Sequence, residues 1–140
     1  MNKQFLIINE PNYKEITEVL THRAEVYLKS KGFDTVVMTA PDISEIPTVL
    51  RYLIKSAELR VSDFRYQGYV ALGCKEFGSD DTRDIMNSLN SLKMQYSLAL
   101  GVGIIAPKDM KHGVEWAASE ATNAAERAVQ LLDVKRGLGL

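Results

Sequence analysis

The segment "GYVALGCKEFGSDDTRD", residues 68–84, contains the pattern that decides the fold. Its first seven residues form an apolar run, which is typical of a strand buried on both faces. Gly78 then marks a turn, and Asp80 and Asp81 suit the first turn of a helix, where carboxylates interact favourably with the helix dipole. One of these aspartates is expected to be the N-cap. A strand, a glycine turn and a helix start commonly form an anion site, but here carboxylates occupy the turn.

Apolar runs elsewhere in the chain predict the rest of the fold. The predicted strands are residues 5–9, 33–39, 67–73 and 97–106. Apolar residues at helical spacing predict helices at residues 13–31, 47–60, 81–94 and 109–136, and the last could also be two helices joined near Thr122 and Asn123. Apolar strands joined by helices indicate a parallel sheet covered on both faces. We therefore expect an α/β fold, a three-layer α/β/α sandwich with a four-stranded parallel sheet.

Length and composition indicate one ordinary globular domain, residues 1–140. The formal net charge of −1 gives no indication of binding to nucleic acid or to an anionic membrane. Cys74 is the only cysteine, so no internal disulfide can form, which fits a reducing cytoplasm. The first strand begins near Phe5, which leaves no room for a signal peptide, and no apolar run approaches the roughly 20 residues that span a bilayer. The expected localisation is cytoplasmic.

Ligands of parallel α/β sheets bind beyond the carboxyl ends of the strands. Four stretches of this chain are predicted to meet there: residues 9–13, 40–47, 74–82 and the region after Val102. These stretches define the candidate site.

Several marks in these stretches occur in the order and spacing of one known family. They are Asn12, "PDISEIP" at residues 41–47, "ALGCKEFG" at residues 71–78, "GVGIIAP" at residues 101–107, and Asn123. In these marks, and over residues 5–134 as a whole, the chain resembles the 6,7-dimethyl-8-ribityllumazine synthase family, also called the riboflavin synthase beta chain, as a divergent member.

The resemblance implies a fold, an assembly and a reaction. The fold is flavodoxin-like, of the lumazine synthase type. The assembly is a homopentamer with active sites at the subunit interfaces. The reaction is a transferase step of riboflavin biosynthesis that condenses 5-amino-6-ribitylaminouracil with 3,4-dihydroxy-2-butanone 4-phosphate. The family uses neither a metal nor an organic cofactor, so none is expected here.

Carried over position by position, the resemblance also implies the substrate-binding residues. Asn12 and Glu45 match the family, and a carboxylate such as that of Glu45 accepts hydrogen bonds from hydroxyl or ring N–H groups. Pro11 stands where the family has an aromatic residue that stacks on the pyrimidine, and proline has no π-system. The full set is Pro11, Asn12, Ile43, Ser44, Glu45, Cys74, Lys75, Glu76, Ser79, Asp80, Val102 and Trp116.

The part of the site that handles phosphate and protons departs from the family. Thr82 stands at the position of the family's catalytic histidine, and a threonine hydroxyl does not titrate near neutral pH. Trp116 stands where the family has a phosphate-binding arginine, and an indole donates a single hydrogen bond. Asp80 and Asp81 add charge repulsion toward phosphate. We therefore expect a degraded phosphate and proton-transfer site.

Two basic residues are candidates to replace the missing cation. Arg83 follows the histidine position, and Lys75 lies at the end of the third strand. Either could turn toward the site, or it could remain in solvent or pair with a nearby carboxylate, for which Asp80, Asp81 and Glu76 are available.

Other reactive side chains have structural explanations. Cys74 can be a small buried residue, because no histidine lies near it in sequence to activate it. His22 is expected on the exposed side of the first helix, His112 at the surface or behind the site, and Trp116 in a packing interface. The last helix has a face of alanines between residues 117 and 128, which predicts that another element packs close to it.

Three functions remain open at this point. The first is a lumazine synthase that works with altered residues. The second is a non-catalytic pentameric relative that binds a flavin-like or pyrimidine ligand or serves as a structural subunit. The third is an unrelated flavodoxin-like signalling module, which is disfavoured because no glycine-rich phosphate loop occurs and Glu10 stands alone after the first strand. The expected partners are small-molecule substrates and copies of the same chain, with neither nucleic acid nor membrane.

Overall fold

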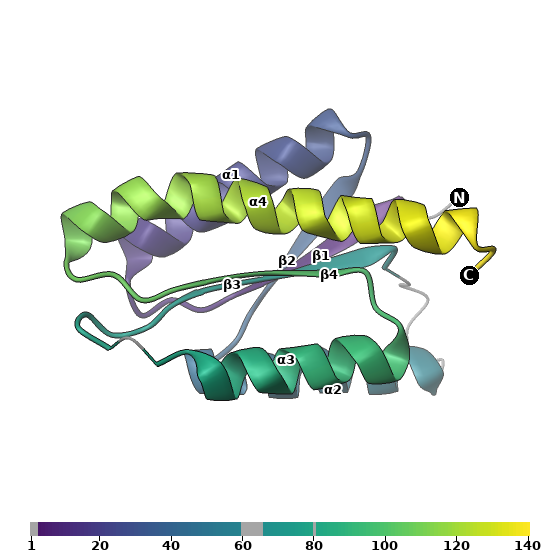
Figure 1. The fold of residues 1–140 in the computed structure, drawn as a ribbon, viewed down its shortest axis with the longest axis horizontal. Helices are drawn as coiled ribbons and strands as arrows, with labels where there is room; N and C mark the ends of the chain where they lie inside the picture. Colours follow the sequence, from purple (N-terminus) through teal and green to yellow (C-terminus); the bar gives the residue numbers. More distant parts are fainter. Residues whose placement is uncertain (1–2, 60–65, 80) are drawn as a thin grey trace.

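The computed structural model describes residues 3–59, 66–79 and 81–140. The elements follow the order β1 (Gln4–Asn9), α1 (Lys14–Ser30), β2 (Asp34–Thr39), the short 3₁₀ helix η1 (Ile43–Glu45), α2 (Ile46–Glu58), β3 (Gly68–Cys74), α3 (Arg83–Tyr96), β4 (Leu100–Ile105) and α4 (Met110–Gly137). The strands pair in parallel in the order β2-β1-β3-β4. Helices α1 and α4 cover one face of the sheet, and α2 and α3 cover the other (Figure 1). The predicted α/β/α sandwich is confirmed.

Strand β3 lies inside the sheet between β1 and β4, and all seven of its residues are buried. This burial explains why its sequence is apolar throughout rather than alternating. Its register places Tyr69 beside both Leu6 of β1 and Leu100 of β4. The carboxyl ends of β1 and β3 therefore lie at the same edge of the sheet, where the candidate site was predicted.

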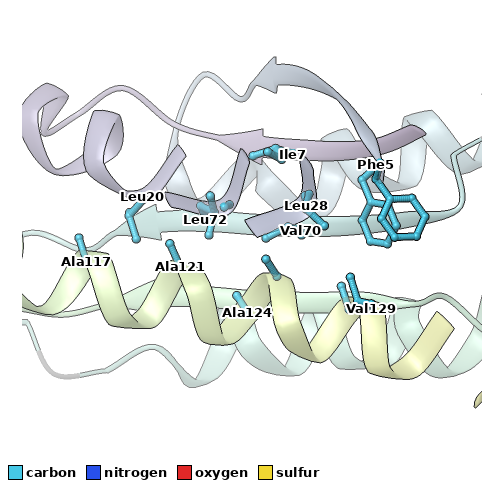
Figure 2. Close-up of a cluster of buried hydrophobic side chains, with 14 of the residues drawn as sticks. Phe5, Ile7, Leu20, Leu28, Val70, Leu72, Ala117, Ala121, Ala124 and Val129 are labelled. Carbon is cyan, nitrogen blue, oxygen red and sulfur yellow. The ribbon is translucent and has the colours of Figure 1, made fainter. Parts of the chain in front are cut away.

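The core between the sheet, α1 and α4 depends on small side chains in α4. Figure 2 shows Ala117, Ala121 and Ala124 on the side of α4 that faces α1 and the sheet. Ala124 lies so close to β4 that a Cβ added to Gly101 would lie 1.8 Å from the Ala124 carbonyl oxygen. Backbone contact of this kind requires residues with little or no side chain, so the predicted close packing on the alanine face is confirmed.

Helix α3 begins two residues later than predicted. It starts at Arg83, and its N-cap is Thr82 rather than either aspartate. Asp81 still stabilises the start of the helix, because its Oδ1 accepts a hydrogen bond from the main-chain N–H of Arg83 at 3.0 Å. Asp80 lies outside the described residues.

The last strand and the last helix also differ in their limits. Strand β4 begins at Leu100, because Ser97 ends α3 in the left-handed conformation with φ of 53° and so cannot continue directly into a strand. Helix α4 is one continuous helix of 28 residues, so the alternative of two helices joined near Thr122 and Asn123 is wrong. Its burial against both α1 and the sheet supports the full length.

Within the described residues, no helix combines the length and apolar character that crossing a membrane requires.

Candidate active site

The segments that follow β1, β2 and β3 enclose a pocket of about 490 Å³ at the carboxyl edge of the sheet. It is lined by Asn12, Tyr13, Asp42, Ile43, Ser44, Cys74, Lys75 and Glu76. Six of these were predicted to bind substrate: Asn12, Ile43, Ser44, Cys74, Lys75 and Glu76. Three segments that are distant in sequence thus meet in one pocket, as the rule for parallel sheets predicts.

One wall of the pocket is organised by Asp42. Its Oδ1 accepts the side-chain N–H of Asn12 at 3.2 Å. Its Oδ2 accepts the hydroxyl of Ser44 at 2.5 Å and the main-chain N–H of Ser44 at 3.2 Å. These hydrogen bonds, led by those from the Ser44 hydroxyl and the Asn12 side chain, lower the pKa of Asp42. The carboxylate therefore stays ionised and ties the segment after β1 to the segment after β2.

A buried carboxylate, that of Glu10, connects two of the residues that line the pocket. Glu10 follows β1 and is 0% exposed. Its Oε2 accepts the N–H of Asn12 at 2.9 Å, and its Oε1 accepts the N–H of Cys74 at 3.2 Å. The Glu10 main-chain carbonyl accepts the hydroxyl of Thr17 at 2.7 Å, which attaches it to α1. Glu10 thereby joins the ends of β1 and β3.

Cys74 is kept in its thiol form by its surroundings. Burial and the nearby charge of Glu10 raise the pKa of Cys74 to about 12. The thiol is therefore neutral near physiological pH and does not act as a nucleophile, which agrees with its predicted role as a small buried residue.

An aromatic pair lies at the pocket. The rings of Tyr13 and Phe77 are stacked, with centroids 4.2 Å apart and planes 18° apart. The main-chain N–H of Phe77 also donates to the Tyr13 hydroxyl at 3.2 Å. Tyr13 lines the pocket, so the β3–α3 turn is fastened to the start of α1 at this point.

Other predicted residues lie around the pocket without lining it. Pro11 instead lines a second cavity of about 450 Å³ beside α1, together with His22, which is exposed as predicted. Glu45 is exposed at the end of η1. Ser79 is half-buried in the turn after β3, where its N–H donates to the Glu76 carbonyl at 3.1 Å.

Two predicted residues lie elsewhere in the same chain. Val102 lines a third cavity, of about 360 Å³, which also includes residues of α3 and α4. Trp116 lies on α4, where its ring stacks on that of His112 with centroids 5.3 Å apart. Neither is among the residues that line the pocket at Asn12.

The residues at the start of α3 form their own ion pair. The Arg83 guanidinium donates to Asp81 at 3.1 and 3.3 Å, and the Arg83 side chain is 84% exposed. This pairing raises the pKa of Arg83 and, through the Arg83 side-chain and main-chain hydrogen bonds, lowers the pKa of Asp81. Thr82 is half-buried next to this pair, and no pocket described above includes it. Lys75, in contrast, lines the pocket.

Sequence reasoning did not select Glu10, Tyr13 or Asp42. The position of Glu10 directly after a buried strand is a signal for a structural role, because a charged residue is rarely buried there unless it is hydrogen-bonded or paired. Asp42 lies one residue after Pro41 and two before Ser44, which is a common spacing for an aspartate that caps a turn. No local signal indicates the contact of Tyr13 with Phe77, which is 64 residues away.

Comparison with known proteins agrees with this geometry. The family described as 6,7-dimethyl-8-ribityllumazine synthase matches residues 2–136. A 6,7-dimethyl-8-ribityllumazine synthase of Paramagnetospirillum magneticum is 29% identical, over 96% of this chain and 96% of its own length. One of Nitrobacter winogradskyi is 31% identical, over 95% of this chain and 86% of its own.

A solved structure shares the fold only. The crystal structure of the flavodiiron protein from Giardia intestinalis has a TM-score of 0.51 and 14% sequence identity, and the match covers 95% of this chain and 38% of that one. The whole-length family match and the strand-end pocket lead to one conclusion: the chain belongs to the 6,7-dimethyl-8-ribityllumazine synthase family.

Proposed function

We propose that this protein forms 6,7-dimethyl-8-ribityllumazine from 5-amino-6-ribitylaminouracil and 3,4-dihydroxy-2-butanone 4-phosphate. The observation that carries the proposal is the pocket in which Asn12, Ser44 and Lys75 meet from three strand ends. The family match over residues 2–136 supports the choice of reaction.

The polar wall of the pocket suits the ribitylamino substrate. Asp42 and Glu76 present carboxylate oxygens, which accept hydrogen bonds from hydroxyl and amino groups. Asp42 is held ionised by Asn12 and Ser44, so this wall is organised before the substrate arrives. A preformed acceptor binds a polyol more tightly, because less side-chain freedom is lost on binding.

Lys75 is the cation best placed for the phosphate of the second substrate. It lines the pocket, whereas Arg83 is paired with Asp81 and exposed. An ammonium binds phosphate as a point charge, without the paired hydrogen bonds of an arginine. We therefore assign phosphate binding to Lys75 and expect it to be weaker than an arginine would provide.

A second copy of the chain completes the proposed site. Val102 lies on β4, an edge strand of the sheet, and Trp116 lies on α4, and both are outside the pocket of their own chain. In a homopentamer with shared sites, a neighbouring subunit would bring such residues to the pocket. This arrangement accounts for predicted site residues that one chain does not gather.

A second candidate function is a non-catalytic relative that binds the pyrimidine or a flavin-like ligand. It is favoured by a specific observation: Thr82 offers only a hydroxyl at the start of α3, and Arg83 is already paired with Asp81. On this account the pocket binds a ligand and no product forms.

A matched pair of variants tests the proposal. Lys75→Gln and Arg83→Gln each remove one positive charge, and product formation is measured against the concentration of the ketose phosphate. We expect Lys75→Gln to raise the KM for this substrate about tenfold, as loss of a charge-assisted contact does. Arg83→Gln should leave it within about twofold, because surface ion pairs contribute little. Equal effects would contradict the role of Lys75, and binding of the pyrimidine without turnover would favour the second function.

A further inference from the structure

Glu10 is the only charged side chain that is buried in the part of the chain that the structure describes. Burying a carboxylate costs several kcal/mol unless it is hydrogen-bonded or paired. Neither of the ion pairs found among the described residues includes Glu10. Its carboxylate oxygens instead accept hydrogen bonds from two main-chain N–H groups, that of Asn12 after β1 and that of Cys74 at the end of β3.

Both of these N–H groups belong to residues that line the pocket. Asn12 donates to one carboxylate oxygen and Cys74 to the other. Asn12 also carries the side-chain bond to Asp42, and Cys74 directly precedes Lys75. A single carboxylate therefore sets the separation between the polar wall of the pocket and the residue assigned to phosphate.

We propose that Glu10 is the positioning residue of this pocket: its buried carboxylate holds Asn12 and Cys74 at the separation that the ligand requires. The part that concerns the ligand rests on the proposed function. Glu10 does not line the pocket, so it acts through the residues that it holds and not by touching the substrate.

A second hydrogen bond to Glu10, from Thr17, provides a matched control. The Thr17 hydroxyl donates to the main-chain carbonyl of Glu10 at 2.7 Å, and this bond does not involve the carboxylate. Thr17→Val removes a buried hydrogen bond at Glu10 but leaves the bonds to Asn12 and Cys74 in place. Glu10→Gln keeps the volume, yet its amide has one acceptor oxygen and directs an N–H group at the second donor.

Two measurements on the full chain test the proposal. The first is the Kd for 6,7-dimethyl-8-ribityllumazine, determined by calorimetry. The second is hydrogen exchange at the amides of Asn12 and Cys74 without ligand. We expect Glu10→Gln to weaken binding about tenfold and to speed both exchanges about tenfold, the effect of one unsatisfied buried donor. Thr17→Val should lower the thermal midpoint but leave Kd and both exchange rates within about twofold.

The outcomes separate this proposal from the proposed function. If the wild-type protein does not bind the lumazine, the proposed function fails, and amide exchange still decides whether Glu10 holds the two strand ends. Unchanged exchange at Asn12 and Cys74 in Glu10→Gln would overturn the positioning role, as would equal loss of affinity in Thr17→Val. If Glu10→Gln does not fold, Glu10→Asp replaces it: the shorter carboxylate should lose one of the two bonds, and wild-type exchange rates at both amides would overturn the proposal.

Discussion

At the scale of single residues, hydrogen bonds decide which charges the pocket presents. The carboxylate of Glu10 accepts two main-chain N–H groups, and that of Asp42 accepts hydrogen bonds from Asn12 and Ser44 and stays ionised. Lys75 is then the cation that lines the pocket. On the proposed function, Lys75 is therefore the residue that binds the phosphate of the second substrate.

Cys74 reports on the charge of Glu10. Because burial and Glu10 raise its pKa to about 12, the thiolate fraction should still be rising at about pH 10. We expect the rate of alkylation by iodoacetamide to increase with pH without a plateau up to about pH 10. In Glu10→Gln the pKa should fall, since one of the two causes is removed, and alkylation should be faster at the same pH. A plateau near the ordinary thiol pKa of about 8.5 in the wild type would contradict this description.

The residues of the site could be predicted only in part. Asn12, Ser44 and Lys75 lie in the segments that follow β1, β2 and β3, so a correct list of strands places them at one edge of the sheet. Glu10 acts through the parallel pairing of β1 with β3, which joins residues 64 apart in sequence. The pairing of Arg83 with Asp81 is one of the alternatives that the sequence leaves open, and the structure decides between them because the Arg83 side chain folds back over its own turn.

At the scale of elements, α4 lies in close backbone contact with β4 at Gly101. A methyl group on Gly101 would meet the carbonyl of Ala124, which belongs to the backbone of a long helix and cannot move alone. Gly137, at the end of the same helix, has nothing within 4 Å of an added Cβ. The two glycines form a matched pair for one substitution.

We expect Gly101→Ala to lower the free energy of unfolding by about 2–4 kcal/mol, because helix α4 must shift away from the sheet. Gly137→Ala should change it by less than about 1 kcal/mol, and in the stabilising direction, since alanine favours a helix more than glycine does. Urea unfolding measures both. A Gly101→Ala protein as stable as the wild type would show that α4 and β4 are not in backbone contact.

Element types were predictable because the strands are apolar throughout and the helices show regular spacing. The residues at which the elements begin and end were less predictable. Helix α3 ends at Ser97, a left-handed residue where glycine is more usual, so the apolar pattern predicts the start of β4 three residues early. Thr122 and Asn123 have low helix propensity, yet they lie within α4 because packing of the surrounding alanines decides the outcome.

At the scale of the whole molecule, one chain presents apolar surface at several places. Among the exposed apolar side chains are Val37 and Met38 on edge strand β2, Tyr52 on α2 and Met94 on α3. Single exposed apolar side chains are common on protein surfaces, and these side chains are available for contact with further copies. This surface fits the proposal that sites are shared between subunits.

Sedimentation equilibrium tests the assembly. We expect a mass of five copies of the 15.6 kDa chain, independent of protein concentration in the micromolar range, since obligate interfaces are large and apolar. A monomer at these concentrations would contradict the proposal that a neighbouring subunit completes the site.

We propose that this pocket makes the lumazine although Thr82 and Trp116 stand where the resemblance places a histidine and an arginine. The most direct test mixes the purified protein with 5-amino-6-ribitylaminouracil and 3,4-dihydroxy-2-butanone 4-phosphate and follows product formation against the spontaneous reaction. We predict a rate above the spontaneous rate that is proportional to protein concentration. A rate equal to the spontaneous one, at a protein concentration that binds the pyrimidine, would contradict the claim and identify the protein as a binding relative.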